Sequence, residues 1–249
     1  MNLAEMLSFT ASEYLDDRTD LVDGEPDDLW SDETIVRYLN HGQRILARRA
    51  WCIKETGVSP AGVIVLQTGK VLYPLHKSIL YVYDATPTTQ TAPLGRADDI
   101  YLRDPYPPSL DALDIGMAAT INGVDTYTGA PLAFASDPAT RTLRVYPEPS
   151  TDQNGLRVLL KIARLPINEL TLDDTEAEPE VPVEYHDDLC LYAAGRCLTQ
   201  PMVDSGYKVD GRALLAEWAD TCREARRDRQ RAENNGSRWG FASTTAVLR

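Results

Sequence analysis

Residues 31–50, SDETIVRYLNHGQRILARRA, decide the fold near the start of the chain because they carry an uninterrupted helical pattern. Ser31 is the expected N-cap, and two acidic residues follow it in the first turn, where the helix dipole favours negative charge. We predict a helix that runs to about Glu55 and stops at Gly57. Its core-facing stripe is Ile35, Tyr38, Leu39, Gly42, Ile45 and Leu46.

Helical periodicity also marks both ends of the chain. Residues 2–15 place Leu3 and Met6 near one face, which predicts a short amphipathic helix. After an acidic, proline-bearing connector, the same period returns in residues 183–199 and 210–232. Several arginines lie near residue 232, where we expect the last helix to end and its dipole to favour cations. Residues 233–249 show no helical or strand pattern, so we expect an extended tail.

Between these helical ends, the apolar period becomes alternating from Gly62 to Pro166, and β-branched and aromatic residues become frequent. Asp137 and Pro138 are typical of a hairpin connection. Residues 105–128 give no clear pattern. The predicted strands are Val63 to Gln67, Val71 to Tyr73, Ile79 to Asp84, Ile100 to Arg103, Pro131 to Ala135, Thr142 to Tyr146 and Leu156 to Arg164.

The predicted fold class is therefore α+β: a helical bundle formed by the N- and C-terminal helices, an inserted antiparallel β domain and an extended C-terminal tail. The predicted parts are N-terminal helices in 1–60, the β domain in 61–168, the acidic connector and C-terminal helices in 169–232, and the tail in 233–249.

Composition narrows the class of protein. A chain of 249 residues that is 43% hydrophobic can bury a core without disulfides or metal. No stretch approaches the roughly 20 apolar residues of a membrane span, and no basic leader precedes the first helix, so we expect a soluble protein with no membrane partner. The four cysteines fit neither a disulfide framework nor a metal knuckle, and we expect them to be reduced and mostly buried.

The net charge of −13 opposes adhesion to nucleic acid, because such binding depends on Lys and Arg replacing counterions on phosphates. The charges are also segregated. Acidic residues dominate 13–33 and 169–188, whereas arginines dominate 37–49 and 223–231. Blocks of opposite sign suggest complementary contacts between subunits or with a partner. For any single block, a solvated face kept for solubility is the simpler interpretation.

Signatures of catalysis are missing from the sequence. The three histidines form no H-x-x-x-H pair, and Gly69-Lys70 lacks the rest of a phosphate loop, so it is better explained as a turn between strands. Neighbouring acids such as Asp187 and Asp188 do not face one another on a helix. We therefore expect no enzyme, no cofactor and no metal.

Two alternatives remain open. One is an enzyme built from carboxylates that are distant in sequence. The other is a non-catalytic, β-rich module on a helical support that binds a carbohydrate or a protein. Its stacking surface would use Tyr101, Tyr106 and Tyr127, which packing within the sheet explains equally well.

In the order of its elements, the chain resembles the head-to-tail adaptor (connector) proteins of tailed bacteriophages. The residues that carry the resemblance are Trp30 to Asn40 with Gln43 and Ala47, Leu72 to His76 before Ile79 and Leu80, and Val181 to His186 followed by Leu189, Tyr192 and Ala193. The resemblance implies a structural virion protein at the head–tail junction, assembled in the bacterial cytoplasm. It would form a ring, commonly of twelve copies, between the portal and the tail or nozzle proteins, with DNA only as passing cargo.

The resemblance also implies roles for particular residues. The C-terminal segment would reach the portal, with Trp239 and Phe241 as anchors beside Arg238 and Leu248. The basic residues Arg37, Arg44, Arg48, Arg223 and Arg226 would contact neighbouring subunits. An acidic lining would keep DNA from adhering to the channel during ejection. Its candidate residues are Asp173, Asp174, Glu176 and Glu178.

Overall fold

The structure is a computed structural model of the chain. It describes residues 1–15, 30–89, 94–96, 128–129, 131, 133–137, 140–201, 203 and 205–244, with the side chains of 95, 96, 128, 129, 133 and 233–244 left aside. Contacts divide the chain into two compact units. The helical unit comprises residues 1–53 and 165–249, and the inserted unit comprises 54–164.

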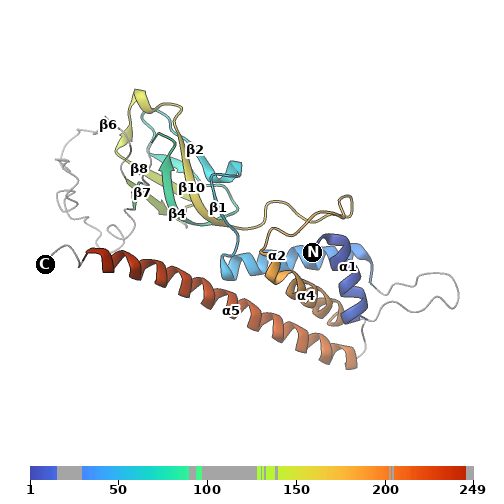
Figure 1. The fold of residues 1–249 in the computed structure, drawn as a ribbon. Coiled ribbons are helices and arrows are strands. Elements are labelled where there is room, and N and C mark those ends of the chain that lie inside the picture. Colours follow the sequence, from blue (N-terminus) through green and yellow to red (C-terminus); the bar gives the residue numbers. More distant parts are fainter. Residues whose placement is uncertain are drawn as a thin grey trace. The chain divides into compact units, whose positions relative to one another are not determined.

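The helical unit is built from both ends of the chain, as the sequence predicts (Figure 1). An N-terminal α-helix continues into a π-helical turn, a long helix follows, and two more helices come from the C-terminal part. The bounds are α1 Leu3–Phe9, the π-helical turn Thr10–Leu15, α2 Asp32–Ala50, α4 His186–Leu198 and α5 Ser205–Thr244.

Helix α2 has the start and the buried face that its sequence predicts. Ser31 is the N-cap residue, and Ile35, Leu39 and Leu46 are buried. The predicted end near Glu55 is wrong, because Trp51 adopts the left-handed conformation (φ 53°) and terminates the helix after Ala50. The apolar spacing before this residue gave no sign of the break.

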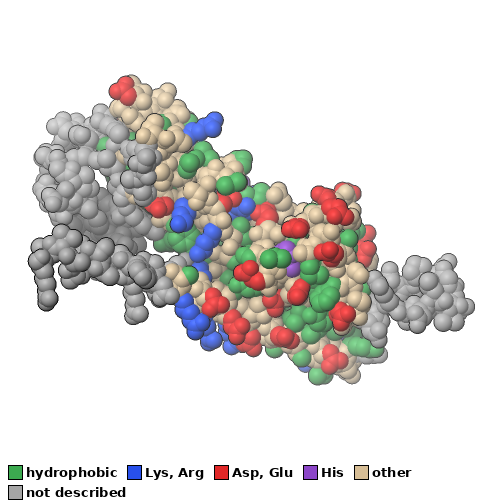
Figure 2. Space-filling view, in the orientation of Figure 1, with side chains coloured by type: hydrophobic (Ala, Val, Ile, Leu, Met, Phe, Trp, Pro, Cys, Tyr) green, Lys and Arg blue, Asp and Glu red, His purple; other side chains and the backbone are tan. Residues whose placement is uncertain are grey.

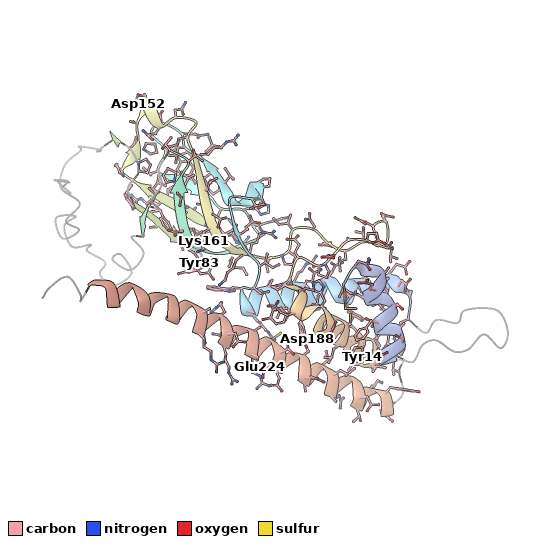
Figure 3. The ribbon with its side chains drawn as sticks, in the orientation of Figure 1. Tyr14, Tyr83, Asp152, Lys161, Asp188 and Glu224 are labelled. Carbon is pink, nitrogen blue, oxygen red and sulfur yellow. The ribbon has the colours of Figure 1, made fainter. Side chains whose placement is uncertain are left out.

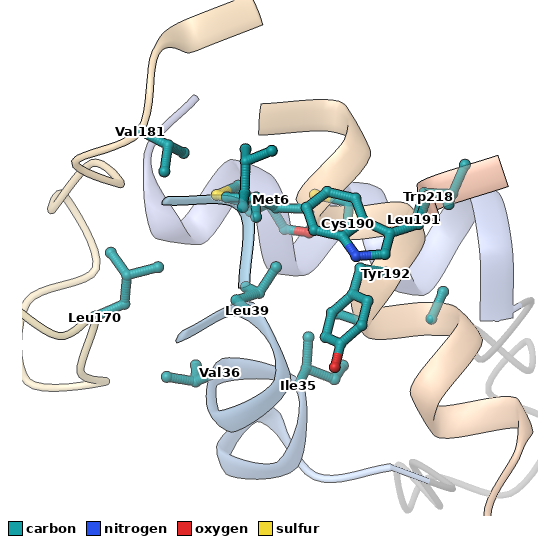
Figure 4. Packing of buried hydrophobic residues seen from close by; sticks show 14 of the residues in the cluster. Met6, Ile35, Val36, Leu39, Leu170, Val181, Cys190, Leu191, Tyr192 and Trp218 are labelled. Carbon is teal, nitrogen blue, oxygen red and sulfur yellow. The ribbon is translucent and has the colours of Figure 1, made fainter. Parts of the chain in front are cut away.

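The core of the helical unit lies between α1, α2, α4 and α5 (Figure 4). Gly42 of α2 allows the close packing, since a Cβ there would lie 3.0 Å from the ring of Tyr192 on α4. Tyr192 in turn packs against Trp218 of α5, with ring centroids 5.2 Å apart. The three longer helices therefore share one core.

Helix α5 is longer than predicted. It starts at Ser205 and its backbone remains helical to Thr244, so it includes most of the segment 233–249. At 1.5 Å per residue it spans about 60 Å. Arg223 and Arg226 therefore lie within the helix and not at its end, and the helix dipole does not account for them.

In the described residues, the inserted unit consists of two four-stranded sheets that share one core and a third sheet of two short strands. In the first sheet β10 pairs with β1 and β2 at one edge and with β4 at the other, always antiparallel. The second has the order β3-β8-β7-β5, and β6 pairs with β9. The bounds are β1 Lys54–Thr56, β2 Val63–Val65, β3 Leu72–Pro74, β4 Ile79–Pro87, β5 Gly95–Arg96, β6 Thr128–Gly129, β7 Ala133–Asp137, β8 Thr142–Tyr146, β9 Glu148–Pro149 and β10 Arg157–Arg164.

Strand β10 shows why this region is β. Val158, Leu160 and Ile162 are buried while Arg157 and Lys161 are exposed, as the alternation predicts. Six of the seven predicted strands correspond to β2, β3, β4, β7, β8 and β10, and the β7–β8 hairpin lies at the predicted place. The seventh, residues 100–103, lies outside the described residues. Strands β1, β5, β6 and β9 were not predicted, and the β5–β7 and β6–β9 pairs are parallel.

The chain enters and leaves the inserted unit through paired strands. Lys54 of β1 is the Cα partner of Ala163 of β10. Beside this pairing, Arg164 Nε donates a hydrogen bond of 2.7 Å to Glu55 Oε2, and the two side chains are only 12% and 9% exposed. Although burial alone would raise the pKa of Glu55, hydrogen bonds from Ser59 and Arg164 hold it below its ordinary value. The base of the insertion is thus fixed by a nearly buried ion pair.

The acidic connector before α4 is an ordered part of the helical unit. Asn40 of α2 donates to the carbonyl of Leu170 (2.8 Å) and accepts from its N–H (2.9 Å). The buried Gln43 accepts from the N–H of Glu180 (3.1 Å). On the other side, the N–H of Leu3 donates to the carbonyl of Ala177 (2.9 Å). Two helices therefore hold the connector in place.

Candidate interaction surfaces

The described residues offer no catalytic constellation that the geometry supports. Among them no three His, Cys, Asp or Glu side chains are arranged to hold a metal ion, and no helix is long and apolar enough to cross a membrane. The four cysteines are free thiols. Burial raises the pKa of Cys52 to about 12 and those of Cys190 and Cys222 to about 11, so these thiols are protonated at neutral pH and are poor nucleophiles.

The basic face predicted on α2 is exposed. Arg37, Arg44 and Arg48 all lie at the surface of the helical unit. Two guanidinium groups, from Arg37 and from Arg196 of α4, lie 5.2 Å and 5.5 Å from the ring centroid of Tyr38. Arg44 forms an ion pair with Glu169 of the connector. This face is therefore basic and aromatic, but part of its charge is neutralised within the subunit.

A hollow between α2 and the connector brings two predicted surfaces together. Arg37 and Arg44, predicted to contact neighbouring subunits, line it beside Asp173, predicted to face the channel. Val36 and Leu172 provide its apolar wall. The basic face and the acidic connector are thus adjacent surfaces of one subunit.

The predicted channel-facing acids are all exposed along the connector. Asp173, Asp174 and Glu178 point to solvent, and Glu176 accepts a hydrogen bond of 3.1 Å from the side-chain amide of Asn2. Because the backbone beneath them is held by α1 and α2, these carboxylates form a fixed acidic surface.

A second acidic surface lies where α4 begins against α5. Thr221 of α5 donates a hydrogen bond of 2.9 Å to Asp188, and Asp187, Glu217 and Glu224 lie near the same carboxylate. Burial raises the pKa of Asp188, the Thr221 hydrogen bond opposes this, and the three neighbouring carboxylates raise it further. Figure 3 shows Asp188 and Glu224 on one side of the helical unit, and Figure 2 shows Asp and Glu side chains spread over that face.

The other predicted arginines lie on α5. Arg223 and Arg226 are exposed, and Arg223 forms an ion pair with Asp220 one turn earlier in the helix. On α2, Arg49 lies close to Cys222 of α5 and lowers the pKa of its thiol, against the larger effect of burial. Helix α5 therefore carries both acidic and basic residues at its exposed surface.

The structure describes the predicted portal contacts only in part. The backbone at Arg238, Trp239 and Phe241 belongs to α5, but their side chains are not described, and Leu248 lies outside the described residues. The aromatic residues of the alternative binding module, Tyr101, Tyr106 and Tyr127, also lie outside them.

The sequence model of the SU10 adaptor protein family matches residues 1–246, which is almost the whole chain. The chain belongs to the SU10 adaptor family. It is therefore a structural adaptor protein of a bacteriophage and a component of the virion, as the sequence resemblance predicted. No curated protein matches the chain.

Several residues that shape this adaptor were not predicted from its sequence. Asn40 and Gln43, which hold the connector, have no signal beyond being polar on the apolar side of a helix. The acidic side of α5 does have a signal, because Asp210, Glu217 and Glu224 recur every seven residues.

Proposed function

We propose that this adaptor protein forms a ring that joins the portal of the phage head to the tail or nozzle proteins, with DNA passing through as cargo. Twelve copies are the number expected from the resemblance. The observation that carries the proposal is the family match over residues 1–246. Assembly would take place in the bacterial cytoplasm before the virion is complete.

The distribution of charge supports a closed ring. A ring uses a heterologous interface, in which one face of a subunit meets a different face of the next copy. The exposed basic residues of α2 and α5 and the acidic surface around Asp188 give the subunit faces of opposite sign. Arg37, Arg48 and Arg226 are the proposed basic contacts, and Arg44 and Arg223 would have to exchange their internal partners.

The acidic connector is the proposed channel lining. Asp173, Asp174, Glu176 and Glu178 are exposed on a loop that both α1 and α2 hold. Fixed negative charge would repel DNA phosphates and let the duplex slide. If an assembled ring carried these residues on its outer rim, this role would be wrong.

The C-terminal end of α5 and the residues after it are the proposed portal contact, with Trp239, Phe241, Arg238 and Leu248 as anchors. Support comes from the position of the last buried contacts of α5. Ala225 is its last residue described as buried, and Arg229 lies over the ring of Trp51 at 4.2 Å. Residues 233–249 come after these contacts in the chain, which is why the portal contact is assigned to them.

The test is to mix the purified chain with the portal of its own phage and to image the product by electron microscopy. A ring of subunits on the portal supports the proposal, whereas a monomer that never docks contradicts it. A variant that lacks residues 233–249 should fold, because the described core contacts remain, and should fail to dock. The paired substitution Trp239→Ala and Phe241→Ala is the matched side-chain test, and docking at full strength would refute the anchor role.

A further inference from the structure

Helix α5 separates opposite charges onto its two flanks. Its inner face is set by Trp218, Cys222 and Ala225, which are buried against the rest of the helical unit. Each residue of an α-helix is rotated by about 100° from the one before it. Residues that lie about 80–120° from Trp218 around the helix axis in one direction form one flank, and residues about 80–140° away in the other direction form the opposite flank. The acidic flank includes Asp210, Glu217 and Glu224, and the basic flank includes Arg212, Arg223 and Arg226.

Both flanks are open to solvent. All six side chains are exposed in the subunit. Within the described part of the chain, no ion pair involves Glu217, Glu224, Arg212 or Arg226, while Arg223 is paired with Asp220. Exposed pairs within one helix contribute little, so Arg223 can exchange its partner at small cost.

Neighbouring helices extend the same division of charge. On the acidic side, Asp187 and Asp188 of α4 lie near Glu217 and Glu224 (Figure 3). Burial is the main cause of the raised pKa of Asp188, and these neighbouring carboxylates raise it further. Arg49 of α2 lies near Cys222, on the inner face of α5, and belongs to neither flank. On the acidic side, the separation of charge therefore belongs to the helical unit as well as to one helix.

The outward strip between the flanks can pack closely at its N-terminal end. Val209, Ala213 and Ala216 lie opposite the inner face, and all three are exposed. Val209 is 63% exposed, although it is apolar. Small apolar residues between charged flanks allow two helices to approach, as at the seam of a coiled coil.

We propose that α5 is the principal contact between copies, with the acidic flank of α5 in one subunit facing the basic flank of α5 in the next. The occupant of each flank is a second copy of this chain. The inference rests on the proposed ring and adds which surfaces close it. Rotation about the ring axis places the acidic flank of every copy beside the basic flank of its neighbour, so every interface has the same complementary pair.

Charge reversal tests this pairing. The acid-reversed variant carries Glu217→Lys and Glu224→Lys, and the base-reversed variant carries Arg212→Glu and Arg226→Glu. The four positions are exposed, so both variants should fold, which far-UV circular dichroism checks. In each variant the two reversed residues outweigh the one that is left unchanged, Asp210 or Arg223, so both flanks have the same net sign. Each variant alone should therefore require at least about tenfold more protein to assemble on the portal than the unaltered chain.

An equimolar mixture of the two variants is the decisive sample. Acid-reversed copies have two basic flanks and base-reversed copies have two acidic flanks, so alternating copies restore attraction at every interface. The mixture should form rings at the concentration that the unaltered chain needs, as measured by mass photometry and electron microscopy. The control changes Lys77→Glu and Arg157→Glu, which alter the net charge as much as the base-reversed variant does, but at exposed sites in the inserted unit, and should leave assembly unchanged.

The outcomes separate this inference from the proposed function. If the unaltered chain never forms a ring, the proposed function fails. If it forms rings and each reversed variant does so equally well, or if the mixture does not recover, the pairing of the α5 flanks is wrong while the ring stands. If the reversed subunits associate with one another normally but lose the portal, the flanks face the portal, and the inference is overturned.

Discussion

Replacement of Gly211 by alanine should destabilise the helical unit, because α4 and α5 cross there at close range. A Cβ on Gly211 would lie 2.8 Å from Leu198 Cβ and 3.1 Å from the carbonyl oxygen of Gly195. Both neighbours belong to α4, and the oxygen is backbone, so the helix itself must shift. Such overpacking destabilises the fold by about 1–3 kcal/mol, and the better helix propensity of alanine offsets up to about 1 kcal/mol of this.

Gly206→Ala is the matched control in the same helix. Its Cβ would have no atom within 4 Å, so it gains helix propensity without a clash. The propensity terms largely cancel between the two variants, and the difference in their free energy of unfolding measures the packing cost, about 1–3 kcal/mol. Thermal unfolding followed by far-UV circular dichroism should place their midpoints roughly 3–10 °C apart. If Gly211→Ala melts at or above Gly206→Ala, the close crossing of α4 and α5 is refuted.

Three further changes test other contacts. Glu55→Gln should cost about 2 kcal/mol by removing the negatively charged partner of Arg164 from a nearly buried ion pair. Because the pKa of Glu55 is lowered in the fold, its contribution to stability is fully present above the unfolded pKa of about 4.3 and is lost as the pH falls through the lower folded pKa. Denaturant titrations should therefore show that the unaltered protein and the Glu55→Gln variant become equally stable in acid. Asp188→Asn keeps an acceptor for Thr221 and removes repulsion, so it should raise the stability at neutral pH by about 0.5 kcal/mol. Because the pKa of Asp188 is raised in the fold, this residue favours folding below its unfolded pKa of about 3.9, and the benefit is lost as the pH rises through the folded pKa. The stability gained by Asp188→Asn should therefore disappear in acid, and a gain that stays the same there would contradict repulsion between the carboxylates. Asn40→Ala removes both hydrogen bonds to Leu170, and hydrogen exchange at the Leu170 amide should accelerate; unchanged protection would show that Asn40 does not hold the connector.

Periodicity predicted the elements of this fold where one face is buried. Ile35, Leu39 and Leu46 on α2 and Val158, Leu160 and Ile162 on β10 are all buried, so the spacing of apolar residues was enough to assign helix and strand. The family resemblance rested on the order of these elements and was confirmed by the match over residues 1–246.

The features that were missed depend on contacts between distant residues. Helix α2 ends because of the conformation of Trp51, and β1 exists because its residues pair with β10, more than a hundred positions later. Arg44 pairs with Glu169 and Asn40 with Leu170, and these partners are also remote in sequence. Local patterns carry no information about such partners.

The paired strands at the base of the inserted unit make it an exchangeable cassette. Lys54 and Ala163 are Cα partners across an antiparallel pair, so the two ends of the cassette lie only about 5 Å apart. A short turn could replace residues 54–164, since both chain ends would already be in position to join. Mutation or recombination could therefore remodel the cassette while leaving the α-helical scaffold, and any contacts made by α5, in place.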